Sequence, residues 1–128
     1  MPAKNQLPRP TEAELEMLRV LWERGPLTVR EIHEGLEENP TGYTTTLKIL
    51  QKMTDKGLVR RDETNRSHVY KPVAKAGDTQ RQLVREFVQR AFGGSPAQLV
   101  MHALSEKKST SAELAEIRLL LDALESKR

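Results

Sequence analysis

The stretch Thr41–Val73 reads TGYTTTLKILQKMTDKGLVRRDETNRSHVYKPV. Apolar residues recur at helical spacing in its first half, which predicts a helix that begins at Thr44 or Thr45 and runs to Lys56. Gly57 follows, and glycine commonly ends a helix because it adopts the left-handed conformation without strain. We therefore expect a helix that stops sharply, with a different kind of structure after it.

Two short runs of β-forming residues follow this helix, at 58–61 and 68–73, and a segment rich in turn residues joins them. We expect a hairpin with Arg66 at its tip. Tyr70 should pack on the helices, because successive side chains along a strand point to opposite faces. A helix followed by such a hairpin is typical of a recognition helix with a β-wing, a unit that holds duplex DNA.

One face of the expected helix is basic. On a helical wheel the inner side carries Tyr43, Leu47, Leu50, Met53 and Thr54, and the opposite side carries Thr45, Lys48, Lys52, Asp55 and Lys56. Ile49 is an exception, since it falls toward the polar side. The threonines Thr44–Thr46 suit a helix N-terminus, where one caps the helix and the others offer hydroxyl and methyl groups to phosphates or base edges. A surface helix with solvated lysines is the alternative interpretation.

Charge is unevenly distributed along the chain. Residues 41–75 contain eight Lys or Arg against three acids, a net +5, whereas residues 11–40 contain three Arg against eight Glu, a net −5. The net charge of +3 for the whole chain hides this division. A local basic block favours a nucleic-acid partner, although solvated charged faces explain charge runs equally well when charge is considered alone.

Two helices are expected before this stretch, and each begins with a capping box. Thr11–Glu14 opens the first, whose inner stripe consists of Leu15, Leu18, Leu21 and Trp22, with Met17 at its edge. Trp22 is interpreted as a core anchor. Thr28–Glu31 opens the second, which places Val29, Ile32 and Leu36 inward and ends near Leu36–Asn39, before a turn at Pro40–Gly42.

The start of the second helix leaves two interpretations open. Thr28 and Arg30 could hold a phosphate at the helix N-terminus, or they are a plain cap beside a solvated arginine. His33 has no second histidine at ligand spacing, so we interpret it as a residue at the core boundary and not as a metal ligand.

The C-terminal part predicts three more amphipathic helices. Asp78 is expected to cap the first, Gly93-Gly94 ends it, and capping boxes at Ser95–Gln98 and Thr110–Glu113 open the next two. Their apolar faces exceed what one small domain can bury, so pairing with a second chain is preferred over burial within a single chain. The expected dimerisation residues are Leu83, Phe87, Leu99, Val100, Leu104, Leu114, Ile117, Leu120, Leu121 and Leu124.

Composition bounds the remaining possibilities. The chain has 128 residues, 37% of them hydrophobic, which suits one domain with a small appendage. No apolar run approaches the length of a membrane span or of a signal region, and there is no cysteine, so the cytoplasm is expected. No nucleophile–base arrangement, glycine-rich phosphate loop or cluster of metal ligands is evident. We therefore expect neither an enzyme nor a cofactor.

Several of these motifs, in this order and spacing, resemble the BlaI/MecI/CopY family of bacterial repressors, also called penicillinase repressors. The resemblance covers roughly residues 8–126. It is carried by Thr11–Glu14 with Leu21-Trp22, Thr28–Glu31, Tyr43–Leu47 with Leu50, Lys56–Val59, and Arg66 with Val69–Pro72.

The resemblance implies a winged helix-turn-helix domain followed by a helical dimerisation region. The third helix would enter the major groove and the wing would touch the DNA backbone, on a palindromic operator bound by a homodimer. By position, the helix role falls to Thr44, Thr45, Thr46, Lys48 and Lys52, and the wing role to Arg60, Arg66 and His68.

The family resemblance also suggests how repression ends. In β-lactam-responsive members a membrane sensor protease system leads to a cut in the dimerisation region. The bond cut there, Asn-Phe, aligns here with His102-Ala103, which departs from the family pattern and puts that mode of induction in doubt. Copper sensing through thiolates, as in another branch, is excluded because the chain has no cysteine.

The sequence therefore predicts a mainly α protein with a small β-wing. Residues 1–10 are expected to be a flexible tail, 11–75 the winged-helix DNA-binding domain, and 76–128 the helical dimerisation domain. The expected function is that of a dimeric, sequence-specific repressor. The alternative is a winged helix that contacts other proteins and ignores duplex DNA.

Overall fold

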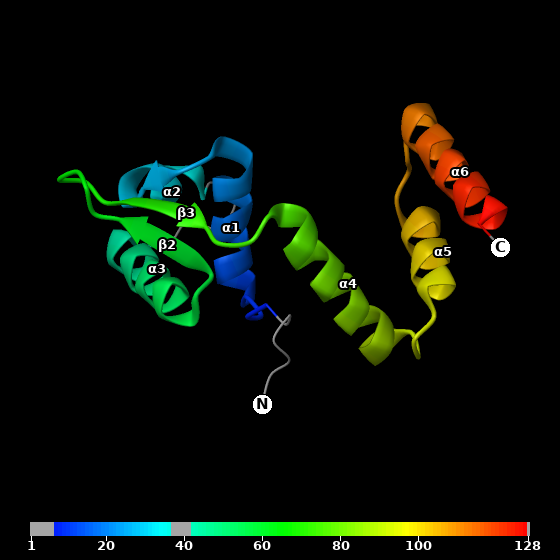
Figure 1. Cartoon of the computed structure of the whole chain (residues 1–128), viewed down its shortest axis with the longest axis horizontal. Helices are drawn as coiled ribbons and strands as arrows, with labels where there is room; N and C mark the ends of the chain where they lie inside the picture. Colours follow the sequence, from blue (N-terminus) through cyan, green and yellow to red (C-terminus); the bar gives the residue numbers. More distant parts are fainter. Residues whose placement is uncertain (1–6, 37–41, 128) are drawn as a thin grey trace. The chain divides into compact units, whose positions relative to one another are not determined.

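The computed structural model describes residues 7–36 and 42–127. Figure 1 shows a mainly helical chain with one small sheet. The elements follow in the order α1 (Glu12–Arg24), β1 (Leu27–Thr28), α2 (Val29–Gly35), α3 (Tyr43–Lys56), β2 (Val59–Asp62), β3 (Val69–Pro72), α4 (Ala76–Ala91), α5 (Pro96–Glu106) and α6 (Ser111–Ser126). Contacts divide the chain into two compact units, Met1–Arg85 and Glu86–Arg128, and α4 spans the division.

Three helices begin with the capping boxes that the sequence predicts. The hydroxyls of Thr11, Thr28 and Thr110 each accept the backbone N–H three residues later, at 3.1–3.2 Å. The glutamate at that position accepts the N–H of the capping threonine in return, at 2.8–2.9 Å. At Ser95 only the first of the two bonds forms, from the Gln98 N–H at 3.3 Å. Each cap contributes about 1 kcal/mol to helix stability.

The end of α3 and the hairpin also follow the prediction. Gly57 adopts a φ of 82°, and its N–H bonds the carbonyls of Met53 and Thr54. After it, β2 and β3 pair antiparallel, with Val59 opposite Pro72 and Asp62 opposite Val69.

One strand was not predicted. Leu27 and Thr28 form β1, which pairs with β3 and gives the order β1-β3-β2. Two residues are too few to show the alternation by which a strand is recognised in sequence.

The core of the first unit joins α1, α2, α3 and the sheet. Its buried members are Met17, Leu18, Leu21, Ile32, Leu36, Leu50, Met53, Leu58, Val59 and Tyr70. The predicted burial of Tyr70 is confirmed. Met17 is also fully buried, although it was expected only at the edge of the stripe. Trp22 packs against this core, and its Nε1–H donates to the Ala74 carbonyl at 3.0 Å.

The inner face of α3 differs from the predicted one by a rotation of the helix. The buried residues are Thr46, Leu50 and Met53, and Ile49 packs against the core instead of facing the polar side. Tyr43, expected inside, is 45% exposed. The helix begins at Tyr43 with Gly42 as its cap and no side-chain capping bond, so the expectation that a threonine caps it was wrong. Pro40 and Thr41 of the expected turn lie outside the described residues, as does the segment 37–39.

Two further expectations near the unit boundary need correction. Asp78 does not cap α4, because the helix already begins at Ala76; Asp78 lies in the first turn and pairs with Arg81. Residues 1–10 were expected to be a tail, yet Pro10 is buried and the Leu7 backbone bonds the side chain of Gln82. Of that tail, residues 1–6 lie outside the described ranges.

Candidate nucleic-acid interface

The exposed face of α3 carries two threonines and two lysines, together with Gln51 and Asp55. Thr44, Thr45, Lys48 and Lys52 are all exposed, and the two lysines stand one turn apart. Within the described residues neither lysine forms an ion pair with a carboxylate. The burial of Leu50 and Met53 on the other side of the helix holds this face outward. These four residues lie where the sequence predicts them, as a compact set of hydroxyls and cations on one helix.

Thr46 does not belong to this face, which corrects its prediction as a DNA-contacting residue. Its side chain is 0% exposed. Its hydroxyl lies 2.9 Å from His33 Nδ1 and also makes a long contact of 3.4 Å with the Gly42 carbonyl. Thr46 therefore ties α3 to α2 from within, because its buried hydroxyl is hydrogen-bonded to other protein groups, the half-buried His33 ring and the Gly42 carbonyl.

Tyr43 lies on the surface that Thr46 was expected to join. The sequence had placed Tyr43 in the core instead. Its ring stands edge-on to the His33 ring, with centroids 5.6 Å apart. The Arg30 guanidinium lies 5.9 Å from the centroid of the same ring. Such a cation–π contact contributes about 0.5–1 kcal/mol when exposed. The position of Tyr43, directly before Thr44 at the start of the helix, could have indicated that it belongs to the exposed surface, but the helical wheel assigned it to the core.

The structure distinguishes between the two interpretations of Thr28 and Arg30. The Thr28 hydroxyl already accepts the Glu31 N–H, and the Glu31 carboxylate accepts the Thr28 N–H at 2.9 Å. A carboxylate at this position disfavours a phosphate beside it, which favours the interpretation of Thr28 as a plain cap. Arg30 is exposed and remains available to an anion.

The wing presents cations on the face of the sheet away from the core. Arg60 stands directly opposite Lys71 in the β2–β3 register. Both are exposed, while the adjacent Val59 and Tyr70 are buried. Like charges placed opposite one another destabilise a sheet, so the pair favours binding of an anion at this face. Arg66 and His68 are exposed in the 63–68 connection; Arg66 was predicted there, whereas His68 was expected to open the second strand, which begins at Val69.

Other charged groups of the wing are used internally. Arg61 pairs with Glu63 at 2.5 Å, and hydrogen bonds with the Tyr70 hydroxyl and Glu63 raise its pKa. The hydroxyl and N–H of Thr64 both donate to Asp62 and lower the pKa of that carboxyl. These contacts shape the connection and leave Arg60 and Arg66 as the wing's available arginines.

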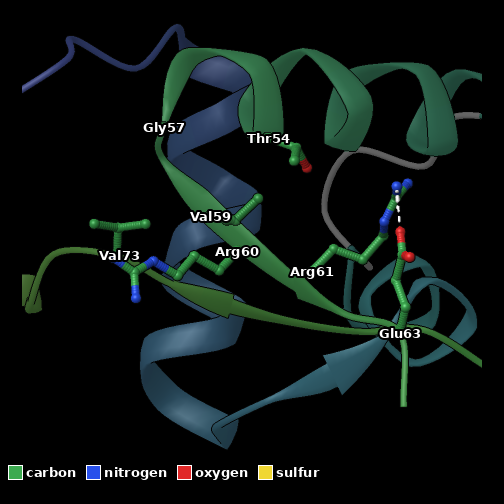
Figure 2. A pocket seen from close by; sticks show the side chains of 7 residues that line it. All are labelled: Thr54, Gly57, Val59, Arg60, Arg61, Glu63 and Val73. Carbon is green, nitrogen blue, oxygen red and sulfur yellow. Dashed lines mark ion pairs between the residues drawn. The ribbon is translucent and has the colours of Figure 1, made fainter. Parts of the chain in front are cut away.

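An open hollow of about 470 Å³ lies between the end of α3 and β2. Figure 2 shows Thr54 and Gly57 on one side of it, with Arg60 and the Arg61–Glu63 pair on the strand side. The Thr54 hydroxyl donates to the Leu50 carbonyl at 2.8 Å, so it is no free nucleophile. The hollow therefore offers a guanidinium and no set of groups for covalent chemistry.

Lys56 lies at the end of the predicted basic face but is not part of the interface. Its ammonium pairs with the buried Glu14 carboxylate at 2.6 Å and also donates to the Arg9 carbonyl. Burial opposes ionisation of Glu14, but hydrogen bonds from Lys56 and Thr11 and the charge of Lys56 outweigh it and lower the pKa of Glu14.

In the described part of the chain, no three His, Asp or Glu side chains are grouped so that they could hold a metal ion.

The model of one protein family, described as penicillinase repressor, matches residues 10–123. The chain belongs to this family. It is 23% identical over 118 residues to the penicillinase repressor of Bacillus licheniformis, an alignment that covers 91% of this chain and 92% of that protein. It is 37% identical over 70 residues to the transcriptional regulator BlaI of Mycobacterium tuberculosis, covering 53% and 51%.

A solved transcriptional regulator from Thermotoga maritima shares the fold. It superimposes with a TM-score of 0.51 and 16% identity over 92% of this chain and 78% of that chain. This likeness confirms the predicted winged helix-turn-helix fold, and the match of the family model confirms the predicted family. Since the relatives are transcriptional repressors, the chain is a DNA-binding repressor and no enzyme.

The C-terminal unit of the repressor leaves large apolar side chains in solvent. No residue of α5 or α6 is buried. Five of the residues predicted for dimerisation are about half exposed (Phe87, Val100, Leu120, Leu121 and Leu124), Leu104 is also exposed, and Leu83, Leu99, Leu114 and Ile117 are partly buried. Phe92 packs between Phe87 and His102, with ring centroids 5.5 Å apart in each pair. Large apolar side chains left exposed in such number favour an interaction surface on this unit.

The position predicted for cleavage lies inside a helix. His102 and Ala103 are exposed, but both belong to α5, which runs from Pro96 to Glu106.

Among the described helices, none has the length and apolarity needed to cross a bilayer.

Proposed function

We propose that this repressor acts as a homodimer that binds a palindromic operator, with α3 in the major groove and the wing on the backbone. The observation that carries the proposal is the pair Lys48 and Lys52, one turn apart on the exposed side of a helix whose other side packs into the core. Among residues 7–36 and 42–127 neither lysine pairs with a carboxylate. A compact helix face of this width fits the major groove, where cations reach phosphates and hydroxyls reach base edges.

The contacts divide by chemistry. Lys48 and Lys52 would bind phosphates or guanine edges, and Thr44 and Thr45 would offer hydroxyl and methyl groups at the helix start. Tyr43 joins this surface in place of Thr46, with Arg30 beside its ring. On the wing, Arg60, Arg66 and His68 would bind the backbone or the adjacent minor groove.

The dimer assignment rests on unburied apolar surface. Ile117, Leu120, Leu121 and Leu124 recur at helical spacing on α6, and the last three are at least half exposed. Burial of such side chains contributes about 1.5–3 kcal/mol each, which a second copy could supply. A twofold dimer would present two α3 helices to half-sites one helical turn apart or a multiple of it. The proposal places the protein in the cytoplasm, together with the DNA it would bind.

The relief of repression by proteolysis would need an additional step. A cut at His102-Ala103, by a membrane sensor protease system as in the β-lactam-responsive relatives, requires α5 to unwind locally, because a protease acts on locally unfolded chain. Limited proteolysis of the free and DNA-bound protein, followed by mass spectrometry, would test whether this bond opens before others.

The test of DNA binding is a titration of fluorescent duplexes at several salt concentrations. The duplexes come from selection of bound fragments out of a random-sequence library. The logarithm of affinity should fall steeply with the logarithm of salt, with a slope of about −0.9 for each neutralised phosphate. A protein that enriches no sequence and binds duplex DNA without salt dependence would instead be the winged helix for protein contacts.

A further inference from the structure

A short N-terminal segment, residues 7–10, connects two parts of the first unit that are far apart in sequence. At one end the Leu7 N–H donates to Gln82 Oε1 at 2.8 Å, and Gln82 Nε2 donates back to the Leu7 carbonyl at 2.6 Å. The side chain of Gln82, on α4, therefore bonds both backbone polar groups of Leu7, as a residue of a neighbouring antiparallel strand would. Gln82 is 6% exposed, so both of its polar atoms are satisfied in a buried site.

The other end of the segment is fixed to α3. The Arg9 carbonyl accepts the ammonium of Lys56, the last residue of α3, at 3.1 Å. Lys56 is itself held by the buried carboxylate of Glu14. Pro10 is buried directly before α1 begins. The segment thus has one anchor on the recognition helix and one on α4.

Packing beneath the segment brings the start of α4 into the same assembly. Leu7 and Pro8 line a small apolar cavity of about 30 Å³ together with Trp22, Leu58 and Thr79. Thr79 on α4 is buried, and the Trp22 indole bonds the Ala74 carbonyl just before α4. The first turns of α4 are therefore held to the winged helix by side chains and by the segment 7–10 together.

We propose that residues 7–10 are a strap that fixes the first turns of α4 to the end of α3. In this proposal Gln82 is the positioning residue through which the strap sets the half-site spacing that the repressor accepts. The inference rests on the proposed binding of two half-sites by a dimer.

The strap would affect half-site spacing because α4 connects the winged helix to the C-terminal unit. This helix leads from the winged helix into the unit that carries the exposed apolar faces. If its first turns pivoted about the short connection 73–75, the two recognition helices of a dimer would sample many separations. Once one recognition helix has bound its half-site, a rigid connection holds the other helix at one distance, so half-sites with one spacing are favoured. A flexible connection allows several spacings with similar affinity.

The experiment is a selection from random-sequence duplex DNA with the full-length wild-type protein and with Gln82→Leu, followed by sequencing of the bound fragments. Wild type should enrich an inverted repeat with one spacing. Gln82→Leu should enrich the same half-site sequence with a broader spacing distribution. Its preference for the best spacing over one with a single inserted base pair should fall by about three- to tenfold. A role confined to stability would lower all affinities without changing this ratio.

Two further variants keep the test decisive. Gln80→Leu alters an exposed glutamine of the same helix and should keep the wild-type spacing. Leu7→Pro removes the N–H that donates to Gln82 without altering α4, and serves if Gln82→Leu does not fold. If either variant folds and retains the single wild-type spacing, the strap is refuted while the dimeric function stands. If wild type enriches no inverted repeat, the dimeric function fails and the strap's role fails with it.

Discussion

The ion pair between Lys56 and Glu14 permits a quantitative prediction about stability. The Glu14 side chain is 5% exposed and the Lys56 side chain 36% exposed, with 2.6 Å between Nζ and Oε1. Lys56→Met removes the charge but keeps an unbranched side chain of comparable length. Breaking a buried pair costs about 3–5 kcal/mol, and exposed pairs contribute about 0–1 kcal/mol. Because Lys56 is partly solvated and Thr11 still bonds the carboxylate, we expect a loss of roughly 2 kcal/mol at pH 7.

The same pair predicts a dependence on pH. The pKa of Glu14 is lowered from its ordinary value of 4.5, so the unfolded chain takes up this proton more readily than the folded chain. The contribution of Glu14 is therefore present above the unfolded-state pKa and is lost as the pH falls through the lower folded-state pKa. The difference in unfolding free energy between wild type and Lys56→Met should accordingly shrink as the pH is lowered from 7 toward 3.

Urea unfolding followed by the fluorescence of Trp22, the single tryptophan, measures this difference at fixed protein concentration. Lys52→Met, an exposed lysine one turn earlier on α3, is the matched control and should cost less than about 0.5 kcal/mol. Adding Glu14→Gln to Lys56→Met should recover part of the loss, because it removes the unpaired buried charge. A loss in Lys56→Met that matches the control, or that stays constant with pH, would refute the reasoning.

Three other changes have definite expected results. Thr46→Val removes the hydroxyl that contacts His33, so it should reduce stability by about 1–2 kcal/mol in urea unfolding. The dependence of DNA affinity on salt, given by the slope of log affinity against log salt, should stay at the wild-type value. A weaker dependence would mean that Thr46 contacts DNA. Lys48→Ala should reduce the magnitude of that slope by about 0.9 in anisotropy titrations, and exposed Lys108→Ala should not. Leu121→Glu should convert the dimer to monomer in sedimentation and weaken operator binding, because it places a charge in the proposed apolar contact; an unchanged dimer would place the interface elsewhere.

Local signals were sufficient to predict most elements of the fold. The capping threonines, the glycine after α3 and the turn residues of the wing act within three or four positions of one another, so their effect is written in the sequence itself. The order and spacing of these motifs also identified the family. Exposed Lys48, Lys52, Arg60 and Arg66 were found for a related reason, because charged side chains are mostly exposed unless they are paired.

The rotation of α3 about its axis was decided only by tertiary packing. Tyr43 and Leu47 satisfied a helical wheel as well as Thr46 and Ile49 do, since the wheel shows which residues share a face but not which face meets the core. The half-buried His33 on α2 offers a hydrogen-bond partner to the polar Thr46 inside, while Tyr43 lies at the surface.

The roles of individual charged and amide side chains likewise depend on contacts between residues far apart in sequence, which no local pattern predicts. Lys56 looks like Lys48 and Lys52 in sequence, yet a carboxylate 42 residues away takes it out of the interface. Gln82 and Leu7 meet across 75 residues, so a segment that resembled a tail holds the start of α4. The sequence by itself therefore determined which elements form and which family they belong to. The tertiary structure decided which side chains are exposed on α3 and the wing and which hold the protein together, because that choice depends on partners distant along the chain.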